Sequence, residues 1–341
     1  MKRISILAVV LALALQALPA AGQDKLVVSI WGGSWRDLVA DTAAKKFTQE
    51  TGVAVDFITG GTIDRLNKAK LAKGSPESDL NFTTAHVGWL YANDDLYEPL
   101  DLSKVPNAAN LVDQAKISPY HVGTWAYVYT LGYRPDLIKD VTFESWADLW
   151  KPEVKGKLAA PDFDPSHLVV VSAILSGADA ASWQKGEERL KALKPSFKAF
   201  YTNDANSQPL IANGETPVQV VLSMNAHYMA GQGVPIKLVI PKEGAVLGID
   251  TIAIMKGSKH VDLAYKFINA MLDPAVQAEV AKLKKGSPVV GNAALDPEVA
   301  KLPGVFSTPE QWKSQAIVID HKLRAEKTAE WRKWFAENIM N

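Results

Sequence analysis

Histidine is the residue type in this 341-residue sequence best able to support catalysis or metal binding, because cysteine is absent. The histidines are scattered along the chain, and no two fall in an H-E-x-x-H pattern: His86, His121, His167, His227, His260 and His321. A zinc site built from closely spaced ligands is therefore not expected. A phosphate-binding G-x-x-x-x-G-K-[ST] loop and a G-x-S-x-G nucleophile elbow are also missing. These absences argue against an enzyme, although an active site assembled from distant residues stays open.

A glycine-rich turn near the N-terminus offers a different chemistry, the binding of an anion. Gly32 and Gly33 follow a β-forming run, and Ser34 begins a segment with helical periodicity. Ser34 and Asp37 fit the two ends of a capping box. Backbone N–H groups at the start of a helix attract anions, and glycine lets a carboxylate come close. The turn is therefore a candidate carboxylate site, with an ordinary capped turn as the alternative.

The elements around this turn alternate between strand and helix. Strand patterns at residues 25–30, 53–58 and 80–83 are separated by helical patterns at 35–50 and 63–73. The second half continues in this style, with strands predicted at 157–160, 218–223, 236–240 and 251–255 and helices at 143–149, 166–175, 181–193, 260–271, 274–284 and 308–339. This order predicts an α/β fold with mainly parallel strands.

The chain is long enough for about two domains, but no linker separates them. We therefore expect two lobes joined by crossing strands near residues 125–133 and 248–254. The composition is that of a globular protein, with 48% hydrophobic residues and equal numbers of basic and acidic residues. A chain so close to neutral has no electrostatic attraction for nucleic acid or an anionic membrane. We predict a monomer without cofactor or metal.

The first 22 residues have the pattern of a signal peptide. Lys2 and Arg3 precede an apolar run from Ile4 to Leu18, and the small residues at 20–22 fit a signal peptidase site. The apolar run is shorter than the roughly 20 residues that span a bilayer. We therefore predict cleavage near residue 22 and a periplasmic protein.

Four segments, taken in order, resemble the bacterial extracellular solute-binding proteins of the spermidine/putrescine-binding type. They are residues 26–35 (LVVSIWGGSW), 145–157 (SWADLWKPEVKGK), 235–244 (PIKLVIPKEG) and 248–254 (GIDTIAI). The resemblance implies a periplasmic-binding-protein-like (type II) fold, in which two α/β lobes close on a solute like a hinged clam. It also implies delivery of that solute to the membrane permease of an ABC importer. The expected lobes are residues 23–128 with 250–292, and residues 129–249 with 293–341.

By position, the resemblance places part of a polyamine site in the cleft between these lobes. Asp164 and Asp250 match two of the family's acidic residues, and Trp35 matches an aromatic wall. Each aspartate has an alternative role as a helix or turn cap. His86 and Asn225 follow predicted strands and complete the candidates, although Asn225 is also expected to cap a short helix.

Other family positions are changed. The acid of the N-terminal loop is Ser34 here, a second acid is His167, and three aromatic positions are Gly32, Leu222 and Gly248. A polyamine needs a carboxylate for each ammonium group and aromatic walls along its chain. The reduced set favours a short polyamine, or a zwitterion such as an amino-acid derivative or opine. Three alternatives stay open: an exported hydrolase, a ferric-ion-binding protein and a chemosensory binding protein.

Overall fold

The computed structural model describes residues 25–139 and 141–341, so the predicted signal peptide lies outside the described residues. Ten strands form one mixed sheet within the described part, in the order β2-β1-β3-β9-β4-β7-β5-β6, with β10 beside β9 and β8 beside β4. The strands are β1 (Leu26–Ile30), β2 (Val55–Thr59), β3 (Leu80–Thr84), β4 (Val122–Tyr133), β5 (Leu158–Pro161), β6 (Phe197–Tyr201), β7 (Val218–Leu222), β8 (Lys237–Val239), β9 (Ala245–Ile254) and β10 (Ala316–Ile317). The α-helices are α1 (Ser34–Val39), α2 (Lys45–Thr51), α3 (Thr62–Leu71), α4 (Ala85–Asn93), α5 (Ser166–Ile174), α6 (Glu187–Leu193), α7 (Asp204–Ala212), α8 (Ser223–Gly231), α9 (Val261–Met271), α10 (Pro274–Lys284), α11 (Pro297–Ala300), α12 (Pro309–Ser314) and α13 (His321–Phe335).

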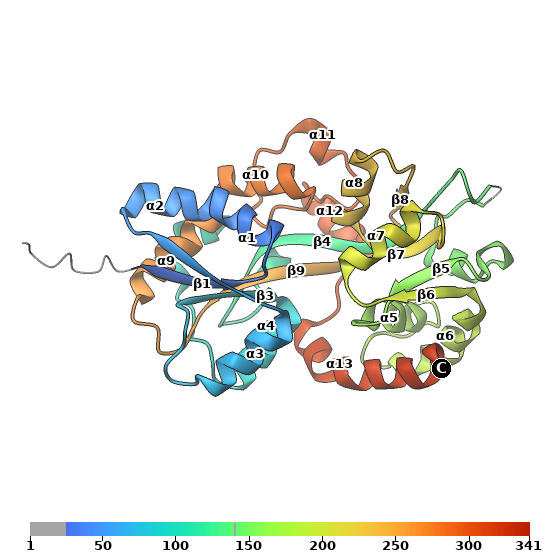
Figure 1. Cartoon of the computed structure of the whole chain (residues 1–341), viewed down its shortest axis with the longest axis horizontal. Helices are drawn as coiled ribbons and strands as arrows, with labels where there is room; N and C mark the ends of the chain where they lie inside the picture. The colour runs from blue at the N-terminus through green and yellow to red at the C-terminus, as the bar shows by residue number, and fades with distance from the viewer. Residues whose placement is uncertain (1–24, 140) are drawn as a thin grey trace, which may run out of the picture.

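The sheet passes through two lobes (Figure 1). One lobe holds β1, β2 and β3 with α1 to α4 and α9, and the other holds β5, β6 and β7 with α5 to α8. β4 and β9 cross between the lobes as an antiparallel pair, from Val122 opposite Ile252 to Tyr129 opposite Val246. The predicted α/β fold with two crossing strands is confirmed. The residue numbers at which the lobes divide stay a prediction.

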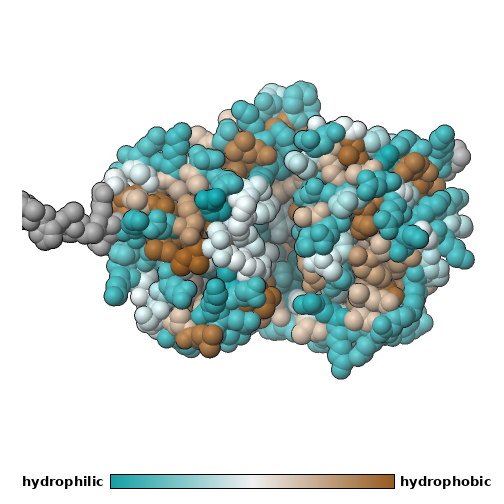
Figure 2. Space-filling model, in the orientation of Figure 1, coloured by the Kyte–Doolittle hydropathy of each residue, from teal (hydrophilic) through white to brown (hydrophobic). Residues whose placement is uncertain are grey.

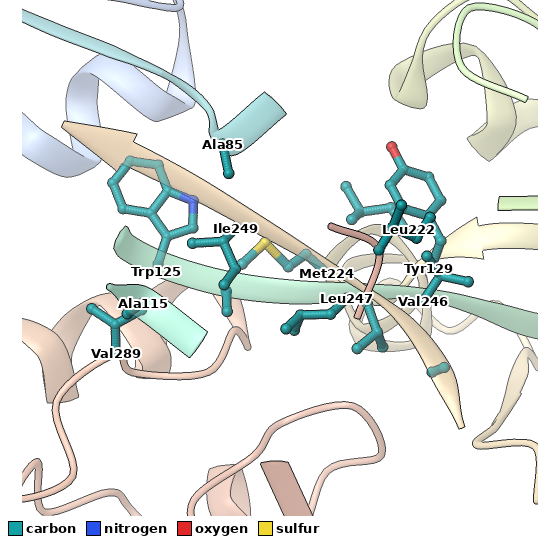
Figure 3. Close-up of a cluster of buried hydrophobic side chains, with 14 of the residues drawn as sticks. Ala85, Ala115, Trp125, Tyr129, Leu222, Met224, Val246, Leu247, Ile249 and Val289 are labelled. Atoms are coloured by element: carbon teal, nitrogen blue, oxygen red, sulfur yellow. The ribbon is translucent and has the colours of Figure 1, made fainter. Parts of the chain in front are cut away.

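The crossing strands form the centre of the hydrophobic core. β9 is buried along its whole length, and β4 is buried at every residue except Tyr127. Nearly continuous apolar sequence of this kind is typical of strands that are covered on both faces. Figure 3 shows Trp125, Ile249 and Leu247 packed around the crossing. β4 carries a bulge, because Gly123 pairs with Thr251 whereas Trp125 pairs with Asp250.

The C-terminal segment differs from its prediction as one helix over residues 308–339. Thr308 begins α12 with a capping box, and β10 then pairs with β9. Asp320 begins α13, because its Oδ1 accepts a hydrogen bond from the backbone N–H of Leu323 at 2.7 Å. α13 lies against both α4 and α5, and the ammonium group of Lys322 stands 5.7 Å from the ring centre of Trp89 on α4. The last helix therefore touches both lobes.

Two elements were missed, and one further prediction was wrong. Residues 197–212 form β6 and α7, for which the sequence yielded no strand or helix prediction; α7 contains the helix-breaking Pro209. Asn225 does not cap α8, which begins at Ser223; it lies within α8, and its Nδ2 donates to the carbonyl of Asp204 at 2.7 Å. No helix in the described part of the chain is long and apolar enough to cross a membrane.

Candidate functional site

A cleft of about 620 Å³ lies at the crossing strands. Its walls come from both lobes, namely from α1, α3 and α4 on one side and from α5's leading loop, α7 and α13 on the other, with β4 and β9 between them. Figure 2 shows the groove that separates the two lobes on one face of the molecule. Ligand sites of proteins are concave and lie preferentially between domains, so this cleft is the candidate site.

Six of the nine predicted site residues line this cleft: Ser34, Trp35, His86, Asp164, Asn225 and Asp250. Gly32, Gly33 and His167 are not among the lining residues. The capping box expected at the glycine-rich turn does not form, because Gly33 occupies the N-cap position of α1 and no side chain bonds the first turn. The hydroxyl oxygen of Ser34 instead accepts a hydrogen bond from Nζ of Lys284 at 2.8 Å.

Asp250 of β9 is a buried carboxylate with no ion-pair partner in the described part of the chain, and the charge of Arg65 reaches it only from beyond ion-pair distance. Its Oδ2 accepts from Nε1 of Trp125 at 2.8 Å, and its Oδ1 accepts from the hydroxyl of Tyr127 at 3.1 Å. No ion pair forms at Asp250 with any described residue. Burial raises the pKa of Asp250 to about 7, because loss of water penalises the charged form.

Asp204 is a second carboxylate of the same kind, and the sequence prediction missed it. It is the first residue of α7, where Asn203 is the N-cap. Both of its carboxylate oxygens accept from the hydroxyl of Tyr129, at 2.8 and 2.9 Å. Burial raises the pKa of Asp204 to about 6. An Asn-Asp pair is a recognisable helix start. Because neither β6 nor α7 was predicted, this pair was not recognised as the start of a helix at the cleft.

Asp164 differs from these two carboxylates because it already has a cation. Its Oδ2 lies 2.5 Å from Nη2 of Arg324, in a pair that is almost fully buried. Its Oδ1 also accepts from the backbone N–H of Ser166, the first residue of α5, although the N-cap of this helix is Pro165. Burial pushes the pKa of Asp164 upward, but the Arg324 guanidinium and nearby histidines hold that pKa well below its usual range.

The histidines around this ion pair are neutral near pH 7. Burial, together with the charge of Arg324, lowers the pKa of His86 to about 3. Burial also lowers the pKa of His167 to about 4. His167 lies behind Asp164, where its Nε2 is 3.3 Å from Nη2 of Arg324 and its ring centre is 3.9 Å from that of Tyr129. It supports the ion pair without lining the cleft.

Five aromatic side chains line the cleft: Trp31, Trp35, Tyr127, Tyr129 and Phe163. Trp35 stacks on the buried Trp125 at 5.3 Å, so it is held by the core. Tyr127 stands directly opposite Gly248, where a Cβ atom would lie 2.1 Å from its ring. Tyr127 therefore fills the space left by the aromatic residue that the resemblance expects at position 248. An aromatic wall is therefore present on β4, the strand that pairs with β9 at this point.

Comparison with known proteins agrees with this geometry. The profile of the family described as bacterial extracellular solute-binding protein matches residues 42–307. A spermidine/putrescine-binding periplasmic protein of Salmonella typhimurium is 29% identical over 304 residues, which cover 85% of each chain. A putrescine/cadaverine-binding protein of Pseudomonas aeruginosa is 28% identical, with 90% of each chain covered.

Solved structures share the fold of this chain. A solved structure of an ABC transporter protein from Clostridium perfringens superposes with a TM-score of 0.81 at 29% identity, covering 92% of this chain and all of the other. Both the profile and the superposition extend over both lobes and the crossing strands. The chain belongs to the bacterial extracellular solute-binding protein family, whose members are the substrate-binding proteins of ABC importers.

Proposed function

We propose that this protein is the soluble solute-binding subunit of an ABC importer and that it captures a small amine-bearing solute. One observation supports an amine group in the solute. The carboxylates of Asp250 and Asp204 face the cleft, bonded to indole and hydroxyl donors but to no cation in the described part of the chain. A buried carboxylate without a counter-ion is costly. An ammonium group of the solute removes that cost, and the aromatic walls contact the rest of the molecule.

The proposal extends to how the protein works. After export and cleavage near residue 22, a periplasmic monomer closes its lobes about the crossing strands and delivers the solute to a membrane permease, without catalysing a reaction. The two-lobe fold supports hinge closure. The Salmonella relative is named as periplasmic, and the names of both relatives specify amines as their solutes.

A thermal-shift screen of amines, diamines, amino acids and opines tests this function. A solute that binds only the folded protein stabilises it by about 2.7 kcal/mol at a concentration one hundred times its Kd. We expect at least one amine-bearing class to raise the Tm. Asp250→Asn should weaken its binding at least tenfold in calorimetry, because an amide cannot neutralise an ammonium group. Asp41→Asn, at an exposed position outside the cleft, is the matched control. If no member of the screen raises the Tm, the proposal is contradicted.

A further inference from the structure

A cation of the protein itself stands beside the cleft, next to the ring of Trp35. Nζ of Lys284 lies 4.6 Å from the centre of that ring, and it donates a hydrogen bond to the hydroxyl oxygen of Ser34 at 2.8 Å. Ser34 and Trp35 both line the cleft, whereas Lys284 does not. The ammonium group is therefore in direct contact with two residues of the cleft wall.

The charge of this ammonium group is not cancelled. Lys284 forms no ion pair with a described residue, and the charge of Asp37 reaches it only from beyond ion-pair distance. Asp37 is itself paired with Arg36 at 2.8 Å. Burial lowers the pKa of Lys284, because partial loss of water penalises the charged form. Lys284 is the last residue of α10, where the helix dipole favours a cation, and the indole ring of Trp35 does the same.

The two ends of the cleft wall therefore differ in charge. Trp35 stacks on Trp125 at 5.3 Å, and Nε1 of Trp125 donates to Asp250 at 2.8 Å. Two stacked indoles thus separate the ammonium group of Lys284 from a carboxylate that has no ion-pair partner. An ammonium group of the solute is attracted to Asp250 and repelled near Trp35, because like charges placed side by side oppose binding.

We propose that Lys284 is a specificity determinant that excludes a positively charged group of the solute from the part of the cleft at Ser34 and Trp35. This inference rests on the proposed function of the cleft. It confines the positive charge of the solute to the end that meets Asp250 and Asp204. The chemical class is an amine that carries its positive charge at one end, rather than an extended polyamine with an ammonium group at each end.

The experiment isolates the effect of a second ammonium group. Straight-chain diamines with three to eight methylene groups are titrated in a calorimeter against n-alkylamines of equal length. The ratio of the Kd of the diamine to the Kd of the alkylamine is compared between proteins. Lys284→Gln should lower this ratio at least fivefold for the longest diamines and change it little for the shortest. Lys284→Arg retains the charge and should retain the ratio of the parent.

Two further measurements separate the charge of Lys284 from its packing. Added salt screens charges at the surface, so it should lower the ratio in the parent and leave the ratio of Lys284→Gln almost constant. Ser34→Asp places a carboxylate beside Nζ and should lower the ratio although Lys284 is retained. Ser34→Asn is the uncharged match for that variant. Lys282→Gln is the control on the same helix, because Lys282 is exposed and does not line the cleft.

The outcomes distinguish this inference from the proposed function. A Lys284→Gln protein that keeps the ratio of the parent at every length overturns the role of Lys284 and leaves the amine-binding function standing. The same conclusion follows if Lys284→Arg lowers the ratio as far as Lys284→Gln does, because charge then has no part in the effect. If neither series binds to the parent or to Lys284→Gln, both proposals fail.

Discussion

Asp250 serves two opposed requirements at the scale of single residues. An ammonium-binding carboxylate is most useful when it is charged and has no partner in the empty protein. Burial of that charge costs stability. The cost appears as a rise in the pKa of Asp250, from an ordinary value of 3.8 to about 7 in the folded protein. The indole of Trp125 and the hydroxyl of Tyr127 offset only part of this cost. The unliganded protein is therefore less stable than its fold allows.

Replacement of Asp250 by asparagine should stabilise the empty protein while it weakens binding of the amine at least tenfold. Asparagine keeps the shape, its Oδ1 can accept from Trp125, and its Nδ2 can donate to the hydroxyl oxygen of Tyr127. The folded parent holds its proton more tightly than the unfolded chain, so its stability falls as the pH rises from about 4 to 7. The variant should therefore unfold with a free energy about 2–4 kcal/mol higher at pH 8.

Urea unfolding at several pH values measures this difference. The gain in unfolding free energy from Asp250→Asn should shrink as the pH falls below 7. It should disappear below about pH 4, where Asp250 is protonated in both the folded and the unfolded parent. Asp41→Asn should show no such pH-dependent gain. A parent that is more stable than Asp250→Asn at pH 8 would show that the carboxylate is held charged by the protein itself, and this would remove the argument for a missing cation.

At the scale of elements, β4 and β9 pair a large aromatic residue with a glycine at the cleft. Tyr127 on β4 and Gly248 on β9 are directly paired, so one position can be large only if the other is small. Glycine is thus required at position 248 because the ring of Tyr127 occupies the space of a side chain, and not because of its backbone conformation. The sequence has glycine at position 248, where the resemblance implies an aromatic residue, but only the register of the two strands shows that Tyr127 stands opposite it.

Gly248→Trp should destabilise the protein by about 1–3 kcal/mol, because overpacking of a filled core has this effect. The double variant Tyr127→Ala with Gly248→Trp should recover most of the loss in thermal unfolding, because the new ring enters the vacated space. Gly231→Trp is the matched control, since nothing lies within 4 Å of a Cβ atom there. A double variant that is no more stable than Gly248→Trp alone would contradict direct competition between the two rings.

The sequence predicted the elements that have strong local signals. α9 and α10 were found almost to the residue, because Asp273 caps α10 and Pro274 begins it. Asp204 and Arg324 were missed for a different reason. Asp204 bonds Tyr129, which lies 75 residues away in the sequence, and Arg324 pairs with Asp164, which lies 160 residues away. The roles of both residues therefore depend on tertiary contacts that no local sequence pattern shows. The face of α13 that meets the cleft is hidden in the same way.

At the scale of the whole molecule, both lobes share one hydrophobic core. A single cluster of buried side chains extends from Leu26 in the first lobe through Trp125 at the crossing to Trp331 in the second. The sheet is also continuous from β2 to β6. Separate unfolding of one lobe would expose the crossing strands, which are buried along nearly their whole length.

Calorimetry should therefore show one unfolding transition, with a van't Hoff enthalpy close to the calorimetric enthalpy. The same midpoint should be obtained by circular dichroism and by tryptophan fluorescence. A bound solute should raise that midpoint without splitting the transition. Two resolved transitions in the unliganded protein would show that the lobes fold independently despite the shared core.

The bulge in β4 has a mechanical consequence. Because the crossing strands are a buried, hydrogen-bonded ribbon, the lobes can reorient only by a change in the twist and bend of that ribbon. A bulge increases local twist and bends its strand, so we expect the ribbon to change its bend most readily between Gly123 and Trp125. Trp125 is also the residue whose indole N–H holds Asp250. The side chain of Trp125 thus connects the bulge of β4 to the carboxylate that we propose binds the ammonium group. We therefore expect a reorientation of the lobes to change the geometry of the site.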